Sequence, residues 1–181
     1  LFEKEDGFKK KFKKLLTKRN TSDSTIDKTV EDIIRQVEKK SDSAVLKLTR
    51  NLDKNKVKNF DDLIVNQKEI DTSLDQVDNK VLGSLKMAIR RVTDYHKRQI
   101  PKNEIYKDKH GVLLGGIWNP IESVGLYVPG GTAAYPSSLI MNAVPALVAG
   151  VSRIVITVPA LNGFLNPVIL ACANLLGIHE I

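Results

Sequence analysis

Apolar residues recur at helical spacing through the first hundred residues of the chain. One amphipathic helix is predicted to begin near Ser24, a second near Ser43, and a third to run from Asn79 to about Gln99, where Pro101 ends it. We therefore expect residues 1–110 to form a helical N-terminal region.

The pattern changes after Gly111. The stretch "GVLLGGIWNPIESVGLYVP" predicts two short strands paired as a hairpin through a turn at Asn119-Pro120. A helix follows in "SSLIMNAVPALVAG", then a fully buried parallel strand in "RIVITVP", a helix in "LNPVILACANLLG" and the start of a strand in "IHEI". This order predicts an α/β fold in which residues 111–181 form an incomplete Rossmann-like parallel sheet unit, with the chain cut at its last strand.

The charge follows the same division. The chain has a net charge of +7, and all but one of its 28 Lys and Arg residues lie in residues 1–110. Basic and acidic residues alternate there and aromatic residues are scarce, which favours a solvated helical surface over a nucleic-acid surface. The exception is the tract from Lys9 to Lys14, which leaves open a non-enzymatic basic module that binds nucleic acid or a protein partner.

The cysteine and histidine content limits which disulfide and metal-binding sites the chain could form. The single cysteine, Cys172, excludes a disulfide framework and favours a reducing, cytoplasmic location. Every long apolar segment is interrupted by Gly, Pro or Asn, so we expect neither a membrane span nor a membrane partner. His96 has no His or Cys one helical turn away, so a packed or capping histidine is favoured over a zinc ligand.

The turn "GLYVPGGTAAYPSS", residues 125–138, is the candidate binding site. In open α/β sheets, ligands collect beyond the carboxyl ends of the strands, where this turn is expected to lie. Pro129-Gly130 suits a type II turn with a positive φ at the glycine, and Gly131 and Ala133 lack bulk. Unpaired N–H groups between Pro136 and Ser138 suit a pyrophosphate.

Tyr127 offers a ring or a hydroxyl to a nucleotide at the same turn. A plain strand-to-helix connection explains these residues equally well, and the dinucleotide fingerprint G-x-G-x-x-G is absent. From the residues alone, the chain is an α/β nucleotide-binding candidate.

Two stretches extend this interpretation. "PIESVGLYVPGGTAAYPSSLIMNAVPALVAGV" and "NPVILACANLLGIHEI" closely resemble histidinol dehydrogenase, most densely from Pro120 to Ile181. The resemblance implies a fold related to that of aldehyde dehydrogenase and a homodimer whose sites borrow residues from both subunits. It also implies a zinc- and NAD-dependent oxidation of L-histidinol through L-histidinal to L-histidine, in histidine biosynthesis.

The resemblance assigns a cofactor role to a few residues of the turn. Tyr127 matches the family's NAD-contacting tyrosine, and the surrounding loop is matched by Pro129, Gly130, Gly131, Thr132 and Ser137. The catalytic glutamate and histidine and the zinc ligands are expected beyond Ile181, with no catalytic or metal-binding residue in this chain.

The chain therefore resembles the N-terminal portion of the enzyme, which we expect to be inactive alone and to self-associate through an exposed strand edge. The alternative that the enzyme is a relative of this family acting on another alcohol stays open, because the residues that bind the substrate are not expected in this chain.

Overall fold

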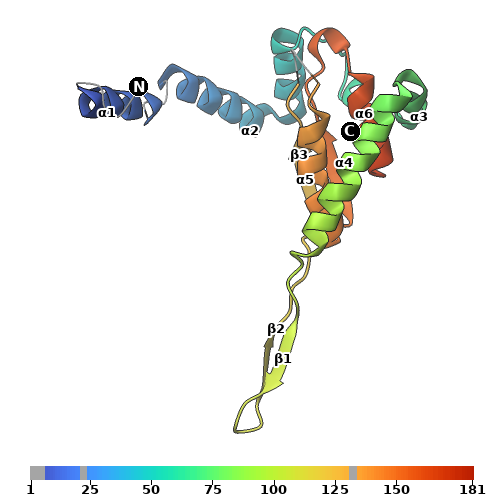
Figure 1. The fold of residues 1–181 in the computed structure, drawn as a ribbon. Helices are drawn as coiled ribbons and strands as arrows, with labels where there is room; N and C mark the ends of the chain where they lie inside the picture. Colours follow the sequence, from blue (N-terminus) through green and yellow to red (C-terminus); the bar gives the residue numbers. More distant parts are fainter. Residues whose placement is uncertain (1–6, 21–23, 131–133) are drawn as a thin grey trace. The chain divides into compact units, whose positions relative to one another are not determined.

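The computed structural model describes residues 7–20, 24–130 and 134–181, and the backbone forms two compact units, Leu1–Leu48 and Thr49–Ile181 (Figure 1). The first unit holds α1 (Phe8–Asn20) and most of α2 (Ser24–Leu52). Ser41 has φ 43° and ψ −129°, so α2 is kinked close to the position where a second helix is predicted. The predicted domain boundary at Gly111 falls inside the second unit and stays a prediction.

The second unit begins with short helical elements that lead into one long helix. These are η1 (Asp61–Leu63), α3 (Gln67–Thr72), η2 (Ser73–Gln76) and α4 (Asn79–Lys97). The Asp78 carboxylate caps α4 by accepting the Lys80 N–H at 2.7 Å. The predicted third helix is thereby confirmed.

The strands pair differently from the predicted hairpin. β2 (Leu113–Gly116) is antiparallel to β1 (Glu104–Lys107), with Glu104 opposite Gly116, and does not pair with β3 (Ser123–Tyr127). The Asp108 carboxylate accepts the N–H groups of His110 and Val112 at 2.8 and 2.9 Å and closes the turn between β1 and β2. The prediction was wrong because this turn lies before β2, within "KDKHG", and not at Asn119-Pro120.

β3 instead forms the predicted parallel sheet. It pairs in parallel with β4 (Arg153–Thr157), with Ser123 opposite Arg153, and Val155 bridges in parallel to Glu180. The predicted final strand is confirmed at that bridge. The Arg153 guanidinium holds the Glu180 carboxylate at 2.6 and 3.0 Å, and this hydrogen bonding lowers the pKa of Glu180.

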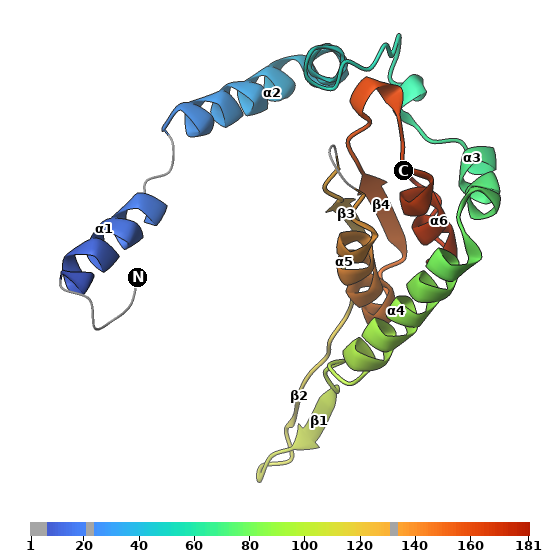
Figure 2. The same cartoon turned by 45° about the horizontal axis from the view of Figure 1, so that its top comes forward.

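α5 (Pro136–Ala149) and α6 (Pro167–Leu175) are the predicted crossover helices, and η3 (Leu161–Gly163) lies between β4 and α6. Gly150 ends α5 in the left-handed region at φ 87°, a conformation that favours glycine. α4 runs along both crossover helices (Figure 2). No helix in the described ranges is long and apolar enough to cross a membrane.

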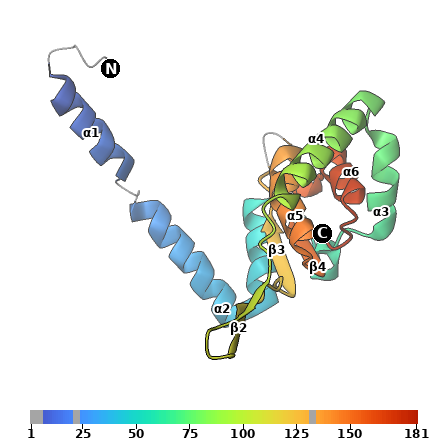
Figure 3. The ribbon, with the colours of Figure 1, turned by 60° about the horizontal axis from the view of Figure 1, so that its bottom comes forward.

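The core lies between these helices and one face of the sheet (Figure 3). It is formed by Leu85, Leu126, Val128, Leu139, Ile140, Ala143, Val144, Ile154, Ile156, Ile169, Cys172, Ala173, Leu176 and Ile178. Along β4, Ile154 and Ile156 are buried whereas Arg153 and Thr157 are exposed. The prediction of a fully buried strand was therefore wrong, because the core takes side chains from only one face of β4.

Candidate nucleotide-binding cleft

A cleft of about 370 Å³ lies beyond the carboxyl ends of β3 and β4. Its walls come from the turn after β3, the turn after β4 and the start of α6. They are formed by Pro129, Gly130, Ala134, Val158, Pro159, Leu161, Asn162, Phe164, Asn166 and Ile169. The cleft lies where ligands collect in open parallel sheets, and its mixture of apolar walls and a few amides is typical of small-molecule sites.

Gly130 allows the two turns to approach each other. A Cβ atom at this position would lie 3.2 Å from Cδ and 3.3 Å from the carbonyl oxygen of Pro159. The φ of Gly130 lies outside the left-handed region, so the predicted type II turn was wrong. The glycine is required by the proximity of Pro159, a tertiary contact, and not by its own backbone conformation.

Tyr127 is the last residue of β3 and lies opposite Thr157. Its neighbours Leu126 and Val128 enter the core, so its side chain projects from the other face of the sheet, where the residue is 61% exposed. Tyr127 is not part of the wall of the cleft formed by Pro129 and Gly130.

The start of α5 carries Ser137, which is exposed. The N-cap is Tyr135, and its carbonyl oxygen accepts the Ser138 N–H at 3.1 Å. The prediction of unpaired N–H groups from Pro136 to Ser138 was therefore wrong for Ser138, and Pro136 has no N–H. Within the described part of the chain, the Ser137 N–H has no acceptor. Gly131, Thr132 and Ala133 lie outside the described residues.

Sequence reasoning missed the half of the cleft that follows β4. Asn162 adopts φ 56°, and its N–H donates to the Asp53 carbonyl oxygen at 2.7 Å, which fixes the loop of η3. The Asn166 side chain caps α6 by accepting the Val168 N–H at 2.9 Å. The order of the strands could have indicated this wall, because the turn after the second parallel strand lies beside the turn after the first.

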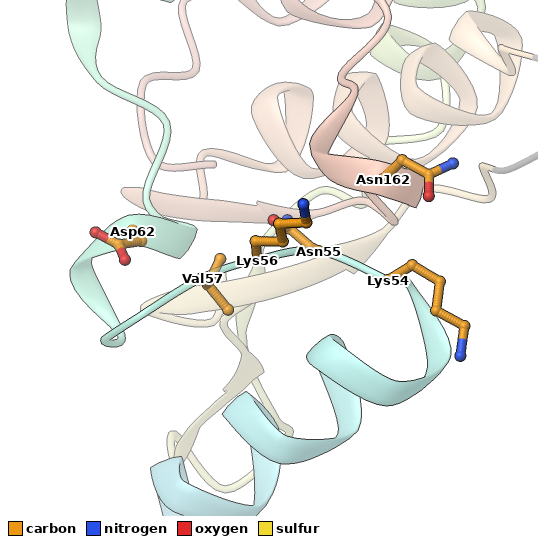
Figure 4. Close-up of a pocket in the computed structure, with 6 residues that line it drawn as sticks. All are labelled: Lys54, Asn55, Lys56, Val57, Asp62 and Asn162. Carbon is orange, nitrogen blue, oxygen red and sulfur yellow. The ribbon is translucent and has the colours of Figure 1, made fainter.

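A second hollow, of about 560 Å³, shares Asn162 with the cleft (Figure 4). Its other walls come from the loop after α2 and include Lys54 and Lys56. At the end of that loop the Asp62 carboxylate accepts the Lys58 N–H at 2.6 Å and the Asn59 N–H at 3.2 Å, and these bonds lower the pKa of Asp62. The hollow thus places two lysines on the loop beside Asn162.

The residues present can be compared with the two cofactors that the resemblance implies. Residues 7–20, 24–130 and 134–181 contain no group of three His, Cys, Asp or Glu side chains able to hold a metal ion, so they do not fit zinc. His96 makes an edge contact with the Tyr95 ring at 5.2 Å. The cleft, by contrast, has the apolar walls and the few amide groups that small-molecule sites share, and Gly130 allows the two turns that form it to approach each other.

A parallel sheet with crossover helices and a cleft beyond its strand ends defines a protein of the open α/β class, which confirms the predicted fold class. The family model described as histidinol dehydrogenase matches residues 16–181, and the chain belongs to the histidinol dehydrogenase family. The resemblance drawn from the sequence is therefore confirmed.

Individual relatives agree with this assignment. The chain is 42% identical over 181 residues to the histidinol dehydrogenase of Brucella abortus, covering 100% of this chain and 42% of that protein. It is 56% identical over 119 residues to that of Rhizobium meliloti, covering 66% of this chain and 27% of the relative. The crystal structure of the Elizabethkingia anophelis histidinol dehydrogenase matches with a TM-score of 0.78 at 29% identity, over 86% of this chain and 36% of that chain. The chain thus spans less than half the length of these relatives.

Proposed function

We propose that this chain supplies part of the NAD site of a dehydrogenase that oxidises L-histidinol through L-histidinal to L-histidine in histidine biosynthesis. The observation that carries the proposal is the cleft between the turns after β3 and β4, held close by Gly130 against Pro159. Membership of the histidinol dehydrogenase family supports the substrate. When bound, NAD supplies the hydride acceptor.

The residues of the chain are proposed to bind and orient the cofactor. Pro129, Pro159 and Phe164 offer apolar walls to a flat ring. The Ser137 N–H lies at the positive end of α5, where a phosphate oxygen is stabilised. Gly131 and Thr132 belong to the same proposed loop, and Tyr127 is proposed to contact the part of NAD that extends past the end of β3 over the other face of the sheet.

Titration of NAD into the purified chain, followed by calorimetry, tests this proposal. We expect saturable binding, weakened about tenfold in Tyr127→Ala, since an aromatic contact of this kind contributes roughly 0.5–1.5 kcal/mol beyond its area. Tyr95→Ala is the matched control, because Tyr95 is also 61% exposed but lies on α4. Absence of binding, or equal losses in the two variants, contradicts the assignment.

We further propose that the catalytic and zinc-binding residues of the dehydrogenase lie outside these 181 residues. Two facts support this: the described residues hold no metal-binding group, and the relatives extend well beyond the matched part. The chain with L-histidinol, NAD and zinc is expected to form no NADH by absorbance while still binding NAD. NADH formation by this chain contradicts the proposal.

A second candidate function comes from α1, where five lysines lie between Lys9 and Lys14. This second candidate is a non-enzymatic basic module that binds nucleic acid or a protein partner. Nucleic-acid binding predicts an affinity for duplex DNA or RNA that falls steeply with salt. Weak binding with a shallow salt dependence, together with NAD binding, favours the dehydrogenase.

For either function we propose the cytoplasm as the compartment, since Cys172 has no second cysteine with which to pair.

A further inference from the structure

The proposed NAD cleft, between the turns after β3 and β4, has walls that do not match the charge of the cofactor. None of its wall residues in the described part of the chain is charged. NAD carries a negative charge on each of its phosphates, and the Ser137 N–H, a single neutral donor, does not balance them. At about 370 Å³ the cleft is also at the low end of ligand-pocket volumes, so a dinucleotide extends beyond it.

The hollow of about 560 Å³ next to this cleft carries positive charge. The two cavities share Asn162, and Lys54 and Lys56 line the hollow from the loop after α2 (Figure 4). Among the described wall residues Asp62 is the acidic one, and Figure 4 shows it at the end of the hollow away from Lys54 and Asn162. The end of the hollow that adjoins the cleft is therefore the positive end.

Both lysines are available to an anion. Each is exposed, and neither forms an ion pair with any residue in the ranges 7–20, 24–130 and 134–181. Lysine is a common phosphate ligand, because its ammonium group is a compact charge on a flexible stem. Lys54 and Lys56 in one hollow therefore suit a pyrophosphate group.

The loop that carries the lysines is held at both of its ends. The Arg50 guanidinium, in the last turn of α2, donates to the carbonyl oxygens of Val57 and Lys58, each at 2.7 Å. At the start of the loop the Asp53 carbonyl oxygen accepts the Asn162 N–H at 2.7 Å, which ties the loop to the wall of the cleft. A loop that is already held in place loses less conformational freedom when an anion binds.

We propose that Lys54 and Lys56 form the phosphate subsite of the dinucleotide cofactor, with the pyrophosphate in the hollow and one nucleoside in the cleft. This inference rests on the proposed function, because it takes NAD as the occupant of the cleft. Asn162 offers an amide donor where the two cavities meet. The lysines bind and orient the cofactor and take no part in hydride transfer.

The salt dependence of NAD binding to the purified chain tests this subsite. Calorimetric titrations at about 50 and 200 mM salt are expected to show an affinity that falls with salt, because salt screens exposed charges. In Lys54→Met/Lys56→Met we expect roughly tenfold weaker NAD binding at the lower salt, and the loss of most of the salt dependence. Lys54→Arg/Lys56→Arg keeps both charges and is expected to keep the affinity within about twofold.

Lys86→Met/Lys97→Met is the matched control, because it removes the same charge from exposed lysines of α4 that do not line the hollow. We expect its NAD affinity to stay within about twofold of that of the unmodified chain. Thermal unfolding by circular dichroism checks that all the variants keep the fold.

Inorganic pyrophosphate separates the phosphate subsite from the rest of the cofactor site. We expect pyrophosphate to bind the unmodified chain, to compete with NAD, and to lose its binding in Lys54→Met/Lys56→Met. Adenosine has no phosphate, so its titration is expected not to distinguish the lysine variant from the unmodified chain.

The possible failures of the two proposals differ. Equal NAD affinity in Lys54→Met/Lys56→Met and the unmodified chain overturns the subsite and leaves the proposed function standing. Pyrophosphate that binds through the lysines but does not compete with NAD, or that binds where NAD does not, assigns the hollow to a separate phosphate ligand and also overturns the subsite. An unmodified chain that binds neither NAD nor pyrophosphate contradicts both proposals.

Discussion

Replacing Gly130 by alanine tests the close approach of the two turns that form the NAD cleft. The new Cβ atom would lie 3.2 Å from Cδ of Pro159 and 3.3 Å from its carbonyl oxygen. Non-bonded carbon atoms prefer about 3.5–4.0 Å, so the turns must separate by a few tenths of an ångström. Pro159 is a rigid ring, and the turn after β4 must therefore move as a whole.

The cost follows from overpacking. Adding a methylene to a packed site costs typically 1–3 kcal/mol, and one methyl beside an open cleft falls at the low end, so we expect the free energy of unfolding to fall by about 1 kcal/mol. Urea unfolding followed by circular dichroism is then expected to show a midpoint about 0.5 M lower, at a slope of ~2 kcal/mol per molar.

Gly83→Ala is the matched control, because Gly83 lies inside α4 and a Cβ atom added there would meet no atom within 4 Å. A helix-interior alanine is worth about 0.5–1 kcal/mol over glycine, so this variant is expected to be more stable. The same glycine-to-alanine change is then expected to lower the free energy of unfolding at position 130 and to raise it at position 83. This difference isolates the effect of the contact with Pro159. A Gly130→Ala midpoint equal to or above that of the unmodified chain, with Gly83→Ala behaving as expected, refutes the reasoning.

Three further predictions follow from burial and charge. Ile156→Ala removes a core side chain and is expected to lower the free energy of unfolding by roughly 3 kcal/mol in urea titration. Ile64 is exposed, so Ile64→Ala is the control and is expected to cost less than about 0.5 kcal/mol. Similar losses in the two variants contradict the assignment of Ile156 to the core. Burial raises the pKa of Cys172 to about 12, so a thiol reagent at neutral pH is expected to react only after unfolding, and rapid reaction with the folded chain contradicts this burial. Because the Arg153 hydrogen bond holds the pKa of Glu180 below its unfolded value, the pair stabilises the fold above that value, and this stabilisation is lost as the pH falls through the folded pKa. Arg153→Met is expected to flatten the acid limb of a plot of urea midpoint against pH, and an unchanged limb contradicts the role of the pair.

The helices and the parallel sheet were predictable because their signals are local. α4, α5 and α6 have periodic apolar positions, and the end of α5 at Gly150 is marked by the residue that its backbone conformation requires. The parallel pairing of β3 and β4 followed from the alternation of strand and helix.

The errors concern contacts between distant residues. The partner of β2 was missed because β1 reads "EIYK", a short stretch with a charge at each end. The role of Gly130 depends on Pro159, which belongs to the next turn of the sheet, and no local pattern distinguishes a tertiary approach from a positive φ. For the same reason Asn162 and Asn166, on the far wall of the cleft, carried no signal of their own.

Hydrogen bonds connect the early and the late segments of the second unit, and this has a consequence for synthesis of the chain. The Asn174 side chain donates to the Ile70 carbonyl oxygen at 3.3 Å across 104 residues, and the Val65 N–H donates to the Ile181 carbonyl oxygen at 3.0 Å. At translation rates of about 5–20 residues per second, α3 leaves the ribosome roughly 5–20 s before α6 exists to pack on it. Ile70, fully buried once α6 has packed, is exposed throughout that interval, so a nascent chain stalled before α6 offers chaperones an apolar segment that the folded second unit conceals.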